Sequence, residues 1–214
     1  MKKIAFKLSV IALAASLAGC AMTPSAQDID LATSEVMKSS FRAQGDVKLD
    51  RLTLDASNRA CSDAQGAALD EKLGRAIEAA NFKTVKFPAD GKLIGSWAAG
   101  EKIAQNGRGL TWTDKAGDAN GGSCYNCHQI SKAELSYGSL GPSLYNYGKL
   151  RGVTDPMSVD SKPIVDYTWG KLWNAKAYNA CSGMPRFGHA DILTEQQLRD
   201  VMALLLDPKS PVNQ

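Results

Sequence analysis

The clearest pattern of apolar and polar positions lies near the end of the chain. Apolar residues recur there at the spacing of one helix face, at Leu198, Val201, Met202 and Leu205. Thr194 is a favourable N-cap residue, and Gln197 at the third helical position completes a capping box. The pattern therefore predicts a helix that begins after Thr194, ends at Asp207-Pro208 and buries Met202 in the core.

Two earlier segments also have the composition of helices. Residues 63–80 are rich in alanine and leucine, and residues 92–105 form an amphipathic segment that is followed by glycines. Gly100 lies inside the second segment, where glycine normally weakens a helix. We interpret it as a close helix crossing, with a tolerated imperfection as the alternative.

The remaining segments predict irregular structure. Apolar and polar residues alternate over 46–61 and 82–87, which predicts short strands or loops packed on the core. Glycine, proline and polar residues predict a loop over 107–123 and turns throughout 138–191. Residues 20–45 are small and polar and are interpreted as a poorly ordered tether. Together these patterns predict a mainly α protein with an N-terminal extension at 46–91.

The first residues have the pattern of an export signal. Lys2, Lys3 and Lys7 form a basic region, and Ile4–Leu17 is an apolar stretch that ends in small residues. That stretch is too short for a stable transmembrane span. We predict a signal peptide at residues 1–19 and a periplasmic protein; a buried N-terminal helix is the alternative.

The end of this signal resembles a bacterial lipobox. The sequence reads Leu17-Ala18-Gly19-Cys20, which predicts cleavage before Cys20 and lipidation of its thiol. Several lipid chains at one end would give a stable membrane anchor. The alternative is ordinary cleavage after Ala21 or Ala26. Both outcomes place the protein where disulfides are permitted.

The charge balance excludes a basic nucleic-acid-binding protein. The chain has 25 Lys and Arg against 22 Asp and Glu, a formal net charge of +3. Lys2, Lys3 and Lys7 supply this surplus, so loss of residues 1–19 leaves 22 basic and 22 acidic residues. Binding to phosphate backbones needs an excess of Lys and Arg. No nucleic-acid partner is expected.

The motif that predicts chemistry is Cys124-Tyr125-Asn126-Cys127-His128, because C-x-x-C-H is the attachment signature of c-type haem. Its two cysteines lie on one side of a helical turn, where both can form thioethers, and His128 follows as an iron ligand. The alternatives are a thioredoxin-like redox pair and half of a zinc site. A zinc site would need ligands from the few remaining Cys and His residues.

A haem iron bound by His128 needs a second axial ligand or an open position. Met184 is our candidate, because Gly183 and Pro185 fix the backbone around it and few side chains compete nearby. Met157 and His189 are the alternatives. A methionine sulfur would raise the reduction potential relative to a second nitrogen ligand.

Other residues are expected to support this pocket. The Pro142 carbonyl is our candidate acceptor for the free N–H of His128, because such an acceptor orients a ligating imidazole. Leu144 and Tyr145 are expected to pack on the haem. Four further side chains are candidates for reaching the haem propionates, or simply belong to the core: Tyr147, Arg151, Trp169 and Trp173.

Two cysteines remain, Cys61 and Cys181. In an oxidising compartment spare thiols usually pair, so we predict a disulfide that joins the N-terminal extension to the loop carrying Met184. The alternatives are Cys181 as a reactive thiol or axial ligand, and cysteines that stay unpaired or pair between molecules.

At this point the chain resembles a class I cytochrome c, and more specifically SoxX, the smaller subunit of the SoxXA cytochrome complex of bacterial thiosulfate oxidation. The resemblance covers about Lys92 to Asn213. It rests on the haem motif and on four further segments, namely Gly100-Glu101-Lys102, Leu140-Gly141-Pro142-Ser143-Leu144, Gly183-Met184-Pro185-Arg186-Phe187-Gly188 and the stretch from Leu193 to Val212. The resemblance therefore implies a cytochrome c domain at 92–214.

The resemblance also implies a role. A SoxA-like partner would form a heterodimer with this chain and join thiosulfate oxidatively to a cysteine of the carrier protein SoxYZ. This chain would accept electrons from the SoxA haem and pass them to an acceptor cytochrome. It would thus be the electron-transfer subunit of an L-cysteine S-thiosulfotransferase, with one covalent haem c and no catalytic residue of its own. The alternatives are a free-standing or membrane-tethered periplasmic electron carrier, and an isolated catalytic cytochrome.

Overall fold

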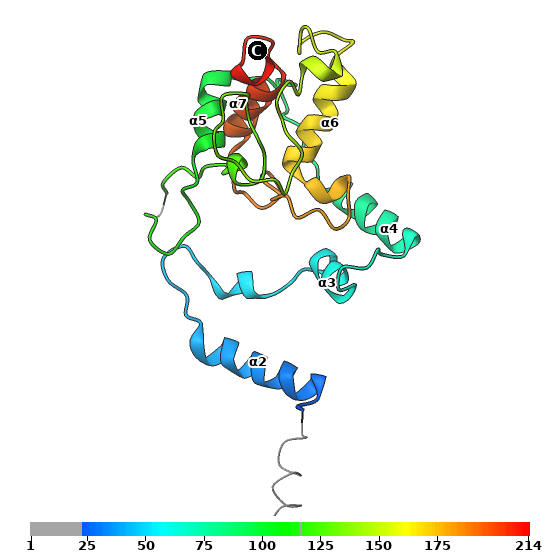
Figure 1. Cartoon of the computed structure of the whole chain (residues 1–214), viewed down its shortest axis with the longest axis vertical. Helices are drawn as coiled ribbons and strands as arrows, with labels where there is room; N and C mark the ends of the chain where they lie inside the picture. Colours follow the sequence, from blue (N-terminus) through cyan, green and yellow to red (C-terminus); the bar gives the residue numbers. More distant parts are fainter. Residues whose placement is uncertain (1–22, 116) are drawn as a thin grey trace, which may run out of the picture. The chain divides into compact units, whose positions relative to one another are not determined.

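The computed structural model describes residues 23–115 and 117–214 (Figure 1). Within these ranges the regular structure is helical, and the only β-pairing is an isolated bridge between Gln44 and Val47. The prediction of a mainly α protein is therefore confirmed. The chain divides into one compact unit that ends at Arg42 and a second that spans Ala43–Gln214. The predicted signal peptide and Cys20 lie outside the described residues.

The first unit contains a helix, α2 (Ala26–Ser40), within the segment predicted to be a poorly ordered tether. Ser25 caps it: its hydroxyl accepts a hydrogen bond from the backbone N–H of Asp28 at 3.1 Å, and the Asp28 carboxylate accepts one from the Ser25 N–H. This capping box offsets the weak apolar pattern of the segment. In the described part of the chain, no helix combines the length and the hydropathy that crossing a membrane requires.

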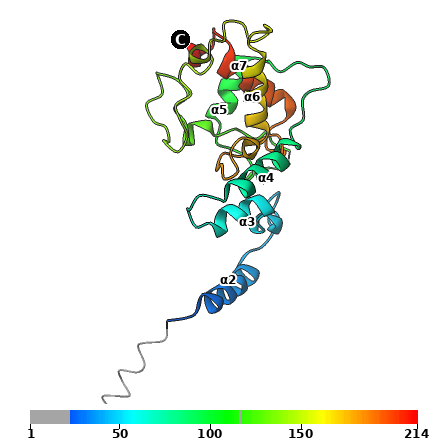
Figure 2. The ribbon, with the colours of Figure 1, turned by 90° about the vertical axis from the view of Figure 1, so that its right-hand side faces the viewer.

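The second unit consists of short helices joined by long loops (Figure 2). In chain order its α-helices and 3₁₀ turns are η1 (Leu49–Leu52), α3 (Ala56–Asp63), α4 (Glu71–Phe82), α5 (Trp97–Gln105), η2 (Cys124–Asn126), η3 (Lys149–Arg151), α6 (Lys162–Trp173), η4 (Ala175–Ala177), α7 (Glu195–Leu206) and η5 (Pro211–Asn213). The predicted last helix is confirmed as α7, with the Thr194–Gln197 capping box present.

Helices α5 and α7 cross closely, and Gly100 lies at the crossing. A Cβ at Gly100 would overlap the carbonyl group of Asp200, so only glycine allows this approach. The buried Asp200 carboxylate accepts a hydrogen bond from the Ser96 N–H at 2.9 Å and thereby holds the start of α5. The interpretation of Gly100 as a close helix crossing is confirmed.

The core of the second unit gathers around α7 and α6. Its largest fully buried side chains include Trp169, Leu198, Met202, Leu204 and Val212. Burial of apolar side chains of this size is the main stabilising contribution to a fold without strands. Met202 is 0% exposed, which confirms its prediction as a core residue.

Three predictions of secondary structure differ from the structure. The helix expected over 63–80 is replaced by α3 and α4, because Gln65 and Gly66 between them have φ of 49° and 86°. Both values lie in the left-handed region, which ends a helix. Of the short strands or loops expected at the alternating segments, residues 83–87 form the loop, whereas 46–61 contains η1 and most of α3. The turn-rich stretch 138–191 contains α6, which the sequence did not indicate.

The N-terminal extension is attached to the core by buried polar contacts. The Asn174 amide donates hydrogen bonds to Asn81 Oδ1 at 3.0 Å and to Thr84 Oγ1 at 2.9 Å. The indole N–H of Trp169 donates to the Lys86 carbonyl at 2.8 Å. These bonds occupy buried polar groups that would otherwise be costly, so residues 81–86 form an integral part of the second unit.

Candidate functional site

The Cys124–His128 segment forms a single 3₁₀ turn. The backbone N–H groups of Cys127 and His128 both donate to the Cys124 carbonyl, at 3.1 and 2.9 Å. In a 3₁₀ turn, side chains three positions apart lie above one another. The sulfurs of Cys124 and Cys127 therefore lie on one side of the turn, and both are free thiols.

The two thiols have different surroundings. Cys124 packs against the hydrophobic core, and this burial raises the pKa of its thiol to about 12. Cys127 is partly exposed. Disulfide exchange requires the thiolate, and the raised pKa disfavours that form of Cys124.

The imidazole of His128 has a fixed orientation. Its Nδ1 lies 2.6 Å from the Pro142 carbonyl oxygen, and because a carbonyl only accepts, Nδ1 carries the proton. The contact predicted from the sequence is therefore confirmed. This tautomer leaves Nε2 with a lone pair, and Nε2 has no hydrogen-bond partner among the residues that the structure describes.

Gly141 makes room for this imidazole. A Cβ at Gly141 would overlap the His128 ring, so the ring lies against bare backbone. The Gly141 N–H donates to the Cys127 carbonyl at 2.8 Å, which ties the Pro142 loop to the cysteine turn. The loop and the turn together form a cradle for the ring, and any larger residue at 141 would displace it.

The candidates for a second axial ligand differ in burial. Met184 is partly buried and packs against the same hydrophobic cluster as Cys124. Met157 is 70% exposed in a loop. His189 is exposed, and partial burial followed by the nearby Arg186 charge lowers the pKa of its imidazole. Of the three, Met184 is the one that packs against the core.

Cys61 and Cys181 form a disulfide, with their Cα atoms 5.5 Å apart. The predicted pairing is confirmed. A reactive or metal-binding Cys181 is therefore not what the structure shows. The bond joins α3 to the segment that precedes Met184.

Trp173 carries a buried polar atom that the structure leaves without a partner. Its indole Nε1 has no hydrogen-bond partner within residues 23–115 and 117–214. The ring lies against Gly188, where a Cβ would overlap it. A buried donor without an acceptor is costly, so this N–H is suited to a bound group that accepts a hydrogen bond. Trp173 was one of four candidates in the sequence, and its free N–H distinguishes it.

The other three candidates for a propionate partner already contact other groups of the protein. The Tyr147 hydroxyl bonds to Thr168 Oγ1 at 2.9 Å, and the Arg151 guanidinium lies 3.8 Å over the Tyr147 ring. Trp169 donates to the Lys86 carbonyl. Tyr147 and Trp169 belong to the core, as the alternative interpretation of the sequence had it, whereas Arg151 is exposed and covers the Tyr147 ring.

The donor set fits a haem attached through two thioethers. It comprises two free thiols on one side of a turn, an imidazole with its Nε2 lone pair available, a methionine held against the same core, and an unpartnered indole N–H. The first two features come from residues close in sequence, whereas Met184 and Trp173 come from other segments that pack against the same hydrophobic cluster as Cys124.

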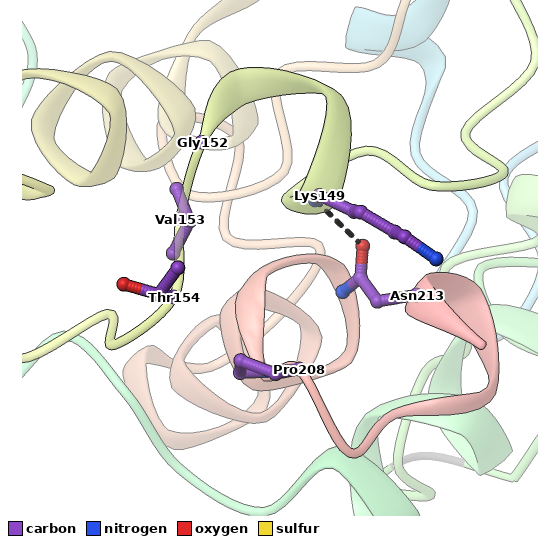
Figure 3. Close-up of a pocket in the computed structure, with 6 residues that line it drawn as sticks. All are labelled: Lys149, Gly152, Val153, Thr154, Pro208 and Asn213. Atoms are coloured by element: carbon purple, nitrogen blue, oxygen red, sulfur yellow. Dashed lines mark hydrogen bonds between the residues drawn. The ribbon is translucent and has the colours of Figure 1, made fainter.

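A separate cavity of about 280 Å³ lies beside the C-terminal turn (Figure 3). It is lined by Lys149, Gly152, Val153, Thr154, Pro208 and Asn213. The Asn213 amide is fully engaged: its oxygen accepts from Gly148 and Lys149, and its nitrogen donates to the carbonyls of Leu205 and Asp207. The cavity contains none of the candidate haem residues and is a feature of packing around the chain end.

Comparison with known proteins gives little functional information. No protein-family model matches the sequence. The chain is 34% identical over 131 residues to an uncharacterized lipoprotein of Aquifex aeolicus (strain VF5), in an alignment that covers 61% of this chain and 58% of that protein. The chain thus matches a little over half of the relative's length.

Proposed function

We propose that the chain is a monohaem c-type cytochrome that transfers electrons outside the cytoplasm. The observation that carries this proposal is the oriented His128 ring, with Nδ1 bonded to the Pro142 carbonyl and Nε2 available, one residue after a turn with two free thiols. A ligating histidine typically donates its other ring N–H to such an acceptor. A redox pair gives no reason for this cradle, and a zinc site would need a further ligand although Cys61 and Cys181 are bonded to each other.

Each residue has a definite role in the proposal. Cys124 and Cys127 attach the haem by adding their S–H groups across its vinyl double bonds, which consumes no oxidant. His128 binds the iron through Nε2, and Met184 binds it through sulfur. Trp173 donates its indole N–H to a propionate. The bound haem supplies a one-electron iron couple, and methionine ligation favours a higher potential than a second histidine.

His128 and Met184 together would hold the iron from both sides and would leave it no open position. The chain therefore exchanges electrons through the haem edge and carries out no bond chemistry alone. This ligand pair distinguishes the chain from an isolated catalytic cytochrome, which would have an open or cysteine-bound iron. Cys181 supplies no ligand, because its sulfur is bonded to Cys61.

Within this class, the proposed role is the SoxX-like subunit of a SoxXA complex, with a class I cytochrome c domain at residues 92–214. It rests on the sequence segments that resemble SoxX. In this role the chain accepts electrons from a SoxA-like haem subunit while thiosulfate is joined to SoxYZ.

A membrane-tethered electron carrier is the second candidate, and one observation favours it. The Aquifex relative is named a lipoprotein, and Leu17-Ala18-Gly19-Cys20 of this chain resembles a lipobox. We infer an exported protein anchored through Cys20. The two candidates share the haem site and the export step, and they differ in whether a larger haem subunit binds.

Three measurements test these proposals. Denatured protein from a host that matures c-type cytochromes should have a mass increased by one haem, and the Cys124→Ala/Cys127→Ala variant should not. An unmodified mass in the parent protein contradicts the cytochrome proposal.

Tagged protein isolated from its native host should retain a second haem subunit if it belongs to a SoxXA complex. Cys20→Ser should release the protein from membranes if the anchor is real.

A further inference from the structure

The segment that carries Met184 is tied to the N-terminal extension on both sides of the methionine. Before Met184, Cys181 is bonded to Cys61, and the Ala180 N–H donates to Glu78 Oε1 at 3.1 Å. After it, the Arg186 guanidinium pairs with the Asp55 carboxylate at 2.5 Å. Residues 180–186 are therefore held at each end by side chains from α3 and α4.

The segment has few other restraints. The Ser182 N–H donates to the Asn179 carbonyl, and the Met184 N–H donates to the Ser182 hydroxyl. Within the described chain, the backbone of residues 182–185 makes no hydrogen bond to a more distant residue. Segments with few hydrogen bonds to the rest of a protein open locally at low cost. Besides the packing of Met184 against the core and the bonds of the Ala180 and Arg186 carbonyls to Lys176 and Ala190, the ties to α3 and α4 restrain the segment on both sides of Met184.

These ties lead back to the core through a continuous set of contacts. The Asn81 amide of α4 donates to Ser57 of α3 at 3.1 Å, and Asn81 also accepts the hydrogen bond from the buried Asn174. Helix α3 buries none of its own residues among those described. Asn81 therefore joins α3 to the interior, and the disulfide and the Asp55 ion pair join α3 to the Met184 segment.

Asp55 has two functions in this arrangement. One carboxylate oxygen accepts from the Asn58 N–H at 2.8 Å and caps α3, and the other faces Arg186. The cap sets the direction in which the second oxygen points. The Arg186 side chain in this ion pair is 20% exposed. Solvent and salt therefore screen the pair less than they would screen a pair at the open surface.

We propose that Asp55 and Cys61 are positioning residues for Met184, and that the extension acts as a clamp that keeps the methionine sulfur on the iron. This inference rests on the proposed function, since it assumes that Met184 is an axial ligand. The clamp acts by limiting how far residues 180–186 open, so its loss raises the frequency with which Met184 leaves the iron.

Imidazole binding to the oxidised protein measures that frequency. Imidazole takes the position of Met184 only after the sulfur has left, so its binding rate at saturating concentration reports the opening of the segment. Asp55→Ser is the most informative variant, because serine still caps α3 but has no carboxylate for Arg186. Its matched control is Asp70→Ser, which changes the equivalent cap of α4, where Asp70 accepts from the Leu73 N–H.

The clamp predicts a graded result. Asp55→Ser should bind imidazole about threefold faster, as expected for loss of a partly exposed ion pair. Cys61→Ser/Cys181→Ser should bind it at least about tenfold faster, because the disulfide closes a long loop. Asp70→Ser should bind it at the parent rate, and all variants should keep the near-infrared band of sulfur-ligated iron.

Three results would overturn the inference. If Asp55→Ser keeps its near-infrared band and binds imidazole at the parent rate, the clamp is absent although the haem proposal stands. Equal acceleration in Asp55→Ser and Asp70→Ser would indicate a general loss of stability. A parent protein without covalent haem or without the near-infrared band would remove the proposed function and the clamp together. Asp55→Ser decides the matter even if the double cysteine variant does not fold.

Discussion

Nδ1 of His128 and the carbonyl oxygen of Pro142 lie 2.6 Å apart, and this hydrogen bond fixes the tautomer of the imidazole. Because the bond uses the only ring proton of the neutral imidazole, Nε2 presents its lone pair away from Pro142. The cradle is assembled by a backbone bond from Gly141 to Cys127. The ligand geometry therefore depends on a glycine that carries no chemistry itself.

Gly141→Ala should impair haem attachment. The added methyl group would overlap the His128 ring and displace it from the Pro142 carbonyl. We expect at least about a fivefold lower yield of covalent haem, since a displacement of about 1 Å is costly for a preorganised site. The yield is measured as haem absorbance per milligram of purified protein. Gly74→Ala, which adds a methyl group in open space, should keep the parent yield; equal yields in both variants would refute the cradle.

Trp173→Phe should lower the reduction potential. Its N–H has no partner within the described protein, and donation to a propionate would offset negative charge near the iron. Without that bond, the oxidised form is favoured.

Trp169→Phe is the control, because its N–H already bonds to the Lys86 carbonyl. That variant should lower the free energy of unfolding by about 1 kcal/mol but leave the potential near the parent value. Spectroelectrochemical titration distinguishes these outcomes, and an unchanged potential in Trp173→Phe would argue against the propionate contact.

Gly100→Ala should destabilise the second unit. Its methyl group would overlap the backbone of α7 at Asp200, so the free energy of unfolding should fall by about 3 kcal/mol. Gly74→Ala on α4 meets no neighbour and should instead raise stability by about 0.5 kcal/mol. Urea unfolding followed by circular dichroism compares the pair. A similar change in both variants would mean that the α5–α7 crossing tolerates a side chain.

The stability contributed by Asp55 should depend on pH. Partial burial tends to raise the pKa of this carboxyl, but the Asn58 N–H and the Arg186 guanidinium outweigh it and hold the pKa below the ordinary value of 3.8. The nearby Lys176 charge acts in the same direction. A lowered pKa stabilises the fold above pH 3.8, and that contribution is lost as the pH falls through the folded-state value.

The comparison that tests this pH dependence is between the parent protein and Asp55→Ser. The difference in their unfolding free energies should be fully present above the ordinary carboxyl pKa of 3.8, and it should shrink as the pH falls through the lower folded-state pKa. A difference that stays constant over this fall in pH would show that Asp55 acts through packing rather than charge.

Local signals explain why parts of the fold were predictable. Helix α7 carries its own capping box and apolar stripe, so its limits follow from nearby residues alone. The cysteine turn is also a short-range feature, whereas the Pro142 contact, 14 residues away in sequence, was predictable because a ligating imidazole needs such an acceptor. The disulfide was predictable by elimination, because Cys61 and Cys181 were the cysteines without another assignment.

Features that depend on tertiary contacts were less predictable. Pro163 lies in the first turn of α6, which begins at Lys162. In a turn-rich stretch proline indicates a turn, but it is also favourable in the first turn of a helix. The break between α3 and α4 occurs at Gln65, which has a left-handed backbone conformation, and no proline nearby indicates it. Whether the Trp173 N–H has a partner depends on which acceptors the fold places around it, and the sequence pattern does not indicate those acceptors.

The measurement that tests the central claim most directly is the near-infrared absorption of the oxidised, full-length protein. We predict a weak sulfur-to-iron band in the parent protein, the same band in Met157→Ala, and its loss in Met184→Ala with the covalent haem retained. A parent protein that carries covalent haem but lacks the band, or a band that survives in Met184→Ala, would contradict the assignment of His128 and Met184 as the axial pair.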